Sequence, residues 1–449
     1  MALVGLLAKA IGLGTFFLVV QYVLAYLRSP LKSIPGPFLA KFSNAWRFLN
    51  HYGQTHIETQ RKLHEQHGDV VRLGPNTVSV SDASLIKTIY NIRGTYLKNA
   101  LQIESIMDDD LRTLCAQLES RFIEDANKGK TCDIADWISF FAWDFLGDMT
   151  WSQRIGFMEQ GMDVGDMLGT AERVMRYFSV VGQIPALDKW LGKNPKWPRF
   201  LYKFDDFSVA AGFSVQRFME RMQNPELGKG KKDFLNGFLE AKKEHPELVT
   251  DNEVIGYMII NSPASKARLV EELRSANLSF PAPYTSIEKL PYLDACIKEG
   301  LRMHPVIGHI LERVVPNSGL TLPNGTIVPP GTIIGVNPWV IHYKEDIYGE
   351  RPHEFRPERW MRAEKEDGAA YEARIRKMKD ADMAFGGGNR VCIGKPLALV
   401  EVYKVVATVF GKYKIDLEHP SKEWDLNKQW FVWPHNIKVK LDMLDSASP

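Results

Sequence analysis

The sequence predicts a mainly α-helical protein that also carries small β-sheets, and three observations support this fold class. Most windows from Leu101 to Leu301 place apolar residues at helical spacing, for example in the stretches Trp137–Trp151 and Phe204–Met222. Near the N-terminus, Asp69–Ser81 holds two short β-rich runs separated by Gly-Pro-Asn, which is the pattern of a hairpin. Further on, Gly319–Pro338 alternates short strand-like runs with proline and glycine, which predicts short strands and turns.

The composition excludes a disordered chain and gives no reason to expect a nucleic-acid partner. Of the 449 residues, 45% are hydrophobic and 24% are charged, and the formal net charge is +2. The four cysteines have no CxxC spacing, which argues against a disulfide framework or a structural zinc site and favours a reducing compartment. No repeat or low-complexity linker divides the chain. One catalytic-type domain is therefore expected over residues 35–449, after a separate segment over residues 1–34.

The N-terminal segment is expected to anchor the protein in a membrane. Ala10–Leu27 contains no charged residue, and as a helix it would be about 27 Å long, enough to span a thin endoplasmic-reticulum bilayer. Arg28 and Lys32 follow this stretch and only Lys9 precedes it, so the body is expected on the cytosolic side. The alternative is a cleaved signal peptide, but no clear A-x-A site follows the apolar run. The SIPGP sequence that comes next predicts a stiff hinge.

The most informative segment is FGGGNRVCIG, from Phe385 to Gly394. Five of its positions carry a fixed pattern of Phe, Gly, Arg, Cys and Gly, and such a match arises by chance in about one chain in ten thousand. Taken separately, the glycines would indicate only a flexible loop and the cysteine only a core thiol. Together they resemble the haem-binding pattern of the cytochromes P450. An apolar run follows, so a helix is expected to begin near Gly394.

The resemblance assigns a role to each residue of this segment. Cys392 is expected to be the axial ligand of the haem iron, because a thiolate donates electron density that favours cleavage of the O–O bond. The helix N-terminus after it would favour the ionised sulfur. Phe385, Gly388 and Gly394 belong to the same cofactor-binding loop, where glycines let the backbone pass close to the haem. Arg390 is the expected partner of a haem propionate, and its alternative is a solvated surface arginine.

Two more motifs follow the family's order along the chain. Glu299 and Arg302 match the Glu-x-x-Arg element, which alone would indicate no more than a surface ion pair. FRPERW resembles the family's Pro-Glu-Arg-Phe element and supplies Arg359, so the three residues are expected to form a buried network near the haem. Arg313 in LERVVP matches a position that often binds the second propionate. His342 could approach the haem edge, although a core or surface histidine is the preferred interpretation.

Two elements of the family are not found in the sequence. The distal helix with its Ala/Gly-Gly-x-Asp/Glu-Thr motif, whose acid and hydroxyl relay protons, has no counterpart, because the helix expected from Asn252 is broken at Pro263. No catalytic acid and threonine pair can therefore be assigned. The Trp-x-x-x-Arg spacing is also missing between Asn99 and Phe122. The resemblance thus predicts a P450-like fold that is incomplete, with a truncated distal helix.

The resemblance implies a haem-thiolate monooxygenase with haem b (iron protoporphyrin IX) as its cofactor. Electrons would come from NADPH through a separate NADPH-cytochrome P450 reductase, and one atom of O2 would enter a small apolar organic substrate. The extended proline- and glycine-rich sequence of the C-terminal half, together with the membrane anchor, is similar to that of fungal P450s of the benzoate-hydroxylase and pisatin-demethylase type. This resemblance implies a role in secondary metabolism. Two alternatives stay open: a truncated, inactive relative that binds haem or nothing, and a membrane-tethered interaction protein without cofactor.

Overall fold

The computed structural model describes residues 29–86, 104–124, 127–184, 187–188, 208–224, 263–392, 394–420, 422 and 425–444, with residues 20, 24, 26 and 27. Within these ranges helices dominate and the sheets are small, which confirms the predicted fold class. The helices that contribute to the argument below are α2 (Ala45–Tyr52), α3 (His56–His67), α5 (Glu104–Leu118), α6 (Ile134–Trp151), α8 (Met167–Val181), α10 (Ser208–Gln223), α13 (Pro263–Ser275), α15 (Pro291–Met303), α18 (Gly368–Asp380) and α19 (Lys395–Lys412).

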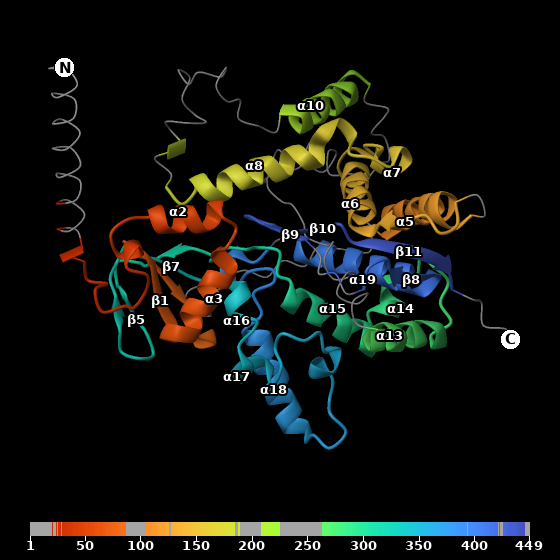
Figure 1. Ribbon diagram of the computed structural model, residues 1–449. Helices are drawn as coiled ribbons and strands as arrows, with labels where there is room; N and C mark the ends of the chain where they lie inside the picture. The colour runs from red at the N-terminus through yellow and green to blue at the C-terminus, as the bar shows by residue number, and fades with distance from the viewer. Residues whose placement is uncertain are drawn as a thin grey trace.

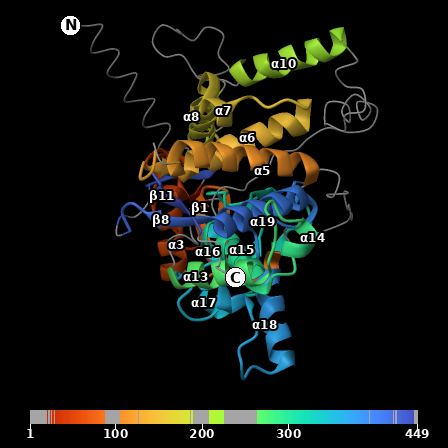
Figure 2. The same cartoon turned by 90° about the vertical axis from the view of Figure 1, so that its right-hand side faces the viewer.

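Short helical turns complete this part of the fold. They are η1 (Leu39–Lys41), η2 (Ala83–Leu85), η4 (Glu119–Ile123), α7 (Phe157–Gln160), η5 (Val164–Asp166), α14 (Tyr284–Ile287), α16 (Pro338–Ile341), α17 (Glu345–Tyr348), η7 (Pro357–Trp360) and η8 (Gly388–Arg390). In Figures 1 and 2, α10 and α18 lie at opposite ends of the molecule, and α15 and α19 lie between them.

The predicted N-terminal hairpin is confirmed. β1 (Val70–Gly74) pairs antiparallel with β2 (Thr77–Val80), and β2 pairs parallel with β7 (Ile333–Val336). β4 (Arg313–Val314) completes this sheet in the order β1-β2-β7-β4. Of the strands predicted within Gly319–Pro338, β7 thus joins a sheet that began more than 200 residues earlier in the chain.

The remaining strands of the described residues form three smaller sheets. They pair β3 (Cys132–Asp133), β11 (Lys438–Met443) and β8 (Tyr413–Leu417) in that order, β9 (Asp425–Lys428) with β10 (Val432–His435), and β5 (Leu320–Thr321) with β6 (Ile327–Val328).

Local sequence explains where the main helices begin. The Asp133 side chain accepts a hydrogen bond from the Ala135 N–H at 3.2 Å, which caps α6. α15 begins at Pro291, whose missing N–H costs nothing in the first helical turn.

The two largest hydrophobic clusters among the described residues hold these elements together. The larger joins α5, α6, α13, α15 and α19, and the smaller lies under the β1-β2-β7-β4 sheet and contacts α17 and α18. Because α15 and α19 lie in the interior of the larger cluster, the segments that lead into and out of them are held on a packed support.

Two predictions fall largely outside the described residues. Most of Ala10–Leu27 lies outside them, and within the parts of the chain that the structure covers no helix is long and apolar enough to cross a membrane. The stretch from Asn252 to the residue before Pro263, where a broken distal helix was predicted, also lies outside.

Candidate functional site

The loop that carries Cys392 connects α18 to α19 and is closed by a hydrogen bond within it. The Cys392 N–H donates to the Phe385 carbonyl oxygen at 2.8 Å. Gly386 and Gly388 have φ values of +72° and +64°, which L-residues with side chains adopt only at a cost. The glycines of the sequence pattern thus allow the chain to turn back and bring Phe385 beside Cys392.

Cys392 differs from the other three cysteines in its surroundings. Cys115, Cys132 and Cys296 are at most 5% exposed, and burial raises the pKa of each thiol. Cys392 is half-buried, and no disulfide involves any of the four. A metal-binding thiolate must be reachable and its negative charge must be tolerated. Of the four cysteines, Cys392 alone meets the first condition.

The start of α19 meets the second condition, that the negative charge of the thiolate is tolerated. Gly394 caps this helix, and the Ala398 N–H donates to the Gly394 carbonyl oxygen at 2.9 Å. Cys392 stands two residues before the cap, next to the positive end of the α19 helix dipole, which favours an anion. The buried Phe385 ring packs with Ala398, and the Lys395 ammonium lies 5.4 Å from the ring centroid. The donor chemistry and the glycine loop therefore fit a haem held through sulfur.

The two predicted propionate partners lie on neighbouring segments. Arg390 is exposed at the end of η8, so its guanidinium can reach an external carboxylate. Arg313 is half-buried in β4, and its guanidinium donates to the Glu312 carbonyl oxygen at 2.7 Å. A Cβ atom added to Gly386 would come within 3.7 Å of Leu311, two residues before Arg313. The strand of Arg313 therefore runs beside the cysteine loop.

The structure brings Glu299, Arg302 and Arg359 together in the core. Arg302 donates to both carboxylate oxygens of Glu299 at 2.9 Å, and the Arg359 Nε donates to Glu299 Oε1 at 2.7 Å. All three are buried, with exposed fractions of 0%, 2% and 7%. Burial opposes ionisation of Glu299, but its two arginine partners outweigh it and lower its pKa.

Two members of this network were missed in the sequence. The Trp360 Nε1–H donates to Glu299 Oε2 at 2.9 Å, and the Arg356 N–H donates to Glu299 Oε1 at 3.0 Å. Both residues flank Arg359 in FRPERW. The tryptophan in place of the family's phenylalanine could have signalled an additional N–H donor, since a buried indole usually has a hydrogen-bond partner.

His342 connects this network to the cysteine loop, which the sequence did not show. It is fully buried, and its Nε2 accepts a hydrogen bond from the Met383 N–H at 2.8 Å. Its Nδ1 lies 2.9 Å from the Arg302 carbonyl oxygen and therefore carries the proton. Burial lowers the pKa of His342 to about 4, so this neutral form is kept at pH 7. Met383 stands two residues before Phe385, so α15 positions the loop through His342.

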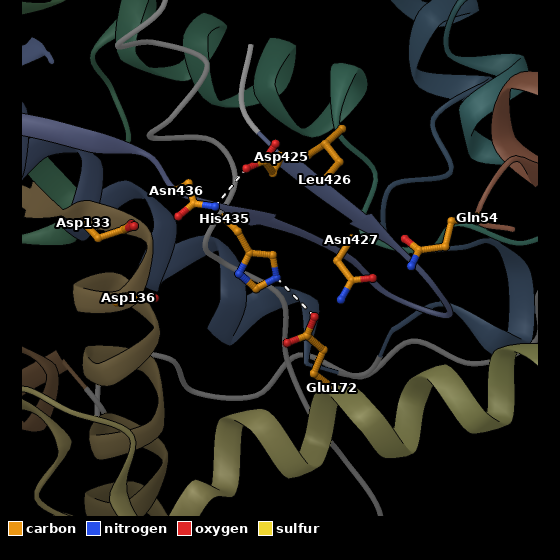
Figure 3. A pocket seen from close by; sticks show the side chains of 9 residues that line it. All are labelled: Gln54, Asp133, Asp136, Glu172, Asp425, Leu426, Asn427, His435 and Asn436. Atoms are coloured by element: carbon orange, nitrogen blue, oxygen red, sulfur yellow. Dashed lines mark hydrogen bonds and ion pairs between the residues drawn. The ribbon is translucent and has the colours of Figure 1, made fainter. Parts of the chain in front are cut away.

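A polar hollow of about 580 Å³ lies between α6, α8 and the β9-β10 hairpin (Figure 3). Figure 3 shows His435 pointing toward Glu172, and their nearest atoms are 3.3 Å apart. This partner raises the pKa of His435, and burial raises the pKa of Asp136 to about 6. None of the residues predicted for haem binding lines this hollow. Its side chains are therefore not placed to act at Cys392.

The family model for cytochrome P450 matches residues 255–441, a range that contains every predicted site residue from Glu299 to Gly394. Three fungal proteins are similar over nearly the whole chain. "Cytochrome P450 monooxygenase cfoH" of Aspergillus candidus is 31% identical over 94% of this chain and 90% of its own. "Cytochrome P450 monooxygenase cicH" of Emericella nidulans is 30% identical, over 92% and 94%. A "Cytochrome P450 monooxygenase" of Aspergillus terreus is 32% identical, over 90% and 94%.

The length of these alignments also shows that the chain lacks residues that its relatives have. The alignment with the Aspergillus candidus protein runs over 485 positions, although this chain has 449 residues in all. At least 36 residues of that relative therefore have no counterpart inside the aligned region.

Proposed function

Because this chain belongs to the cytochrome P450 family, we propose that it is a haem-thiolate monooxygenase in which Cys392 holds the haem iron. The observation that carries this proposal is the half-buried Cys392 on a closed glycine loop at the start of α19. The other cysteines are buried in the core. The bound haem would supply the activation of O2, and its thiolate ligand favours O–O cleavage.

The residues around Cys392 have distinct tasks in this proposal. The loop hydrogen bond between Cys392 and Phe385 fixes the direction of the thiolate, and the N-terminus of α19 stabilises its charge. Arg390 and Arg313 would pair with the two propionates, for which a guanidinium offers two parallel N–H donors. The network around Glu299 holds α15 and the FRPERW segment in place below the loop. These groups bind and orient the cofactor and do not take part in proton transfer.

Electron supply and substrate complete the proposal. NADPH would deliver electrons through a separate NADPH-cytochrome P450 reductase, and the substrate would be a small apolar organic molecule, in fungal secondary metabolism. The apolar stretch Ala10–Leu27 would anchor the chain in the endoplasmic reticulum with residues 35–449 facing the cytosol. Extraction of membranes with alkaline carbonate tests the anchor. The full chain should stay in the pellet, and its release into the supernatant would contradict the anchor.

A second candidate function is a haem-binding relative without monooxygenase activity. The sequence lacks the distal acid and threonine that relay protons in the family, and at least 36 residues present in an aligned relative have no counterpart here. Without that relay, the protonation steps of the reaction would lose their catalyst.

Two measurements separate the candidates. A thiolate-type Soret band in the reduced carbon monoxide difference spectrum would show haem held through sulfur. Turnover of an apolar substrate with reductase and NADPH would then support the monooxygenase. NADPH consumption without oxygenated product, in a protein with that Soret band, would favour the inactive relative.

A further inference from the structure

Three buried histidines from distant parts of the chain meet at the edge of the β1-β2-β7-β4 sheet. His51 lies near the end of α2, His56 begins α3, and His309 stands in the segment between α15 and β4. Their exposed fractions are 4%, 1% and 4%. The His51 ring centroid is 4.1 Å from that of His56 and 4.2 Å from that of His309. His309 thus contacts two histidines that lie more than 250 residues earlier in the sequence.

Three of the six ring nitrogens in this cluster, His51 Nδ1 and both nitrogens of His56, have no hydrogen bond of good geometry to a described residue. The Gly308 backbone lies close to the His56 ring and is its nearest polar neighbour outside the cluster. A buried polar group without a partner costs about 1–3 kcal/mol, so such groups usually have one. The unpaired nitrogens lie on two adjacent rings, His51 and His56, and this indicates a ligand between these rings.

The donor type suits a metal ion, because neutral imidazole nitrogens bind transition metals. The nearby Arg47 is paired with Glu312 at 2.5 Å, so its charge is compensated.

The three rings offer ligand atoms that lie close together. One ligand atom from each ring lies within 4.8 Å of the other two, so a single point exists that is no more than about 2.8 Å from all three. Zinc–nitrogen bonds measure about 2.0–2.1 Å, so each ring would need to move by at most about 0.7 Å. The His51 and His309 rings are stacked, with 10° between their planes, so one of the two would also need to rotate to direct its nitrogen at the ion. The His309 Nε2 lies 3.0 Å from the Ser179 hydroxyl, and metal-binding histidines usually have such a partner at their second nitrogen. The contact of His309 with the Gln429 backbone would give way to the ion.

We propose that His51, His56 and His309 form a binding site for one divalent transition-metal ion of the zinc type, separate from the haem site. Neutral imidazoles select zinc, copper, nickel and related ions over magnesium and calcium. The ion would tie α2 and α3 to the segment that leads into β4. That segment is itself fixed by a hydrogen bond from the Gly308 N–H to the Trp430 carbonyl oxygen at 3.1 Å. The ion would therefore connect α2 and α3 to the segment between α15 and β4, and through the Gly308 hydrogen bond to the segment of Trp430.

The test is zinc binding by the untagged full-length chain, stripped with a chelator and titrated with Zn²⁺. Elemental analysis, which measures zinc separately from haem iron, should find one zinc per chain. Zinc should also raise the midpoint of thermal unfolding, because an ion that binds only the folded state stabilises it.

Variants decide whether this cluster is the site. His56→Phe and His309→Phe should each weaken zinc binding by more than about 100-fold, because loss of a ligand costs more than loss of its outer partner. The matched control is His67→Gln, which changes an exposed histidine at the other end of α3 and should bind zinc normally. Circular dichroism confirms that each variant is folded.

Two outcomes would overturn the proposal. One is a stripped, folded protein that binds no zinc when Zn²⁺ is added back, in which case the three rings pack without a ligand. The other is unchanged stoichiometry and affinity in both phenylalanine variants with loss of zinc in His67→Gln, which would show binding to surface histidines.

Discussion

Arg302 and His342 are joined by two hydrogen bonds in opposite directions. The Arg302 guanidinium donates to the His342 carbonyl oxygen at 2.8 Å, and the His342 Nδ1–H donates to the Arg302 carbonyl oxygen at 2.9 Å. The other ring nitrogen of His342 accepts from Met383, immediately before the cysteine loop. The Glu299 network thus reaches the candidate haem ligand through one neutral histidine.

Replacement of His342 should loosen the cysteine loop. His342→Phe leaves the buried Met383 N–H without a partner, which should lower the free energy of unfolding by about 1–3 kcal/mol and reduce haem retention. His342→Gln should lose less, because an amide both donates and accepts. Urea unfolding and the haem-to-protein absorbance ratio measure the two effects. Equal haem retention in the phenylalanine variant and the native chain would contradict this role.

Loss of the Glu299 charge should be far more costly than loss of a surface carboxylate. Glu299→Gln leaves two buried arginines without their counter-ion, which should reduce the free energy of unfolding by about 3–5 kcal/mol. Glu358→Gln is the matched control, because Glu358 pairs with Arg268 at the surface and should contribute at most about 1 kcal/mol. Urea unfolding measures the free energy of unfolding of both variants. Similar losses in the two variants would show that the network does not stabilise the core.

A methyl group at Gly386 should affect haem binding as well as stability. Gly386→Ala forces an L-residue to φ +72°, at a cost of about 1–2 kcal/mol, and its Cβ would face the Arg390 carbonyl oxygen at 3.4 Å. Gly325→Ala carries the same strain at φ +81° with nothing within 4 Å. Both variants should unfold at lower urea concentration. Only Gly386→Ala should retain less haem, and equal retention in the two would place the loop outside the haem site.

Acidification should destabilise the fold through buried histidines, and His64 isolates the effect. Its ring contacts the Gly68 carbonyl oxygen and the Ser79 hydroxyl, and burial lowers its pKa to about 4. The unfolded chain takes up a proton near pH 6.5 and the folded one only near 4, so stability is lost as pH falls through this window.

The measurement compares urea unfolding at pH 7 and pH 5. Between these values the native chain should lose about 1–2 kcal/mol more than His64→Gln, whose amide does not titrate. His67→Gln, at an exposed position, should follow the native chain. The same pH dependence in native protein and His64→Gln would show that His64 is not held neutral.

Local patterns predicted the parts of the fold that depend on near neighbours. The hairpin of β1 and β2, the helix α6 and the start of α19 after Gly394 follow from periodicity, turn residues and proline. The proximity of Glu299 and Arg302 follows from their spacing of three along a helix. Their burial with Arg359 could be expected only from the resemblance to a family.

Long-range contacts could not be predicted in the same way. His342 meets Met383 and Arg302 through tertiary packing, and its sequence neighbourhood gives no sign of either partner. The same holds for His51, His56 and His309, which come from three separate elements and have no ligand spacing in the sequence. Periodicity reports the face of one element and carries no information on which element packs against it.

The most direct test is the reduced carbon monoxide difference spectrum of the purified chain, its Cys392→Ser variant and, as a matched control, Cys115→Ser. Cys115 is buried in the core, so the control makes the same chemical change away from the loop. A thiolate-type Soret band in the native chain and in Cys115→Ser, and its loss in Cys392→Ser, is the predicted result. Absence of haem from the folded native chain, or the same band in Cys392→Ser, would contradict the assignment of Cys392 as the haem ligand.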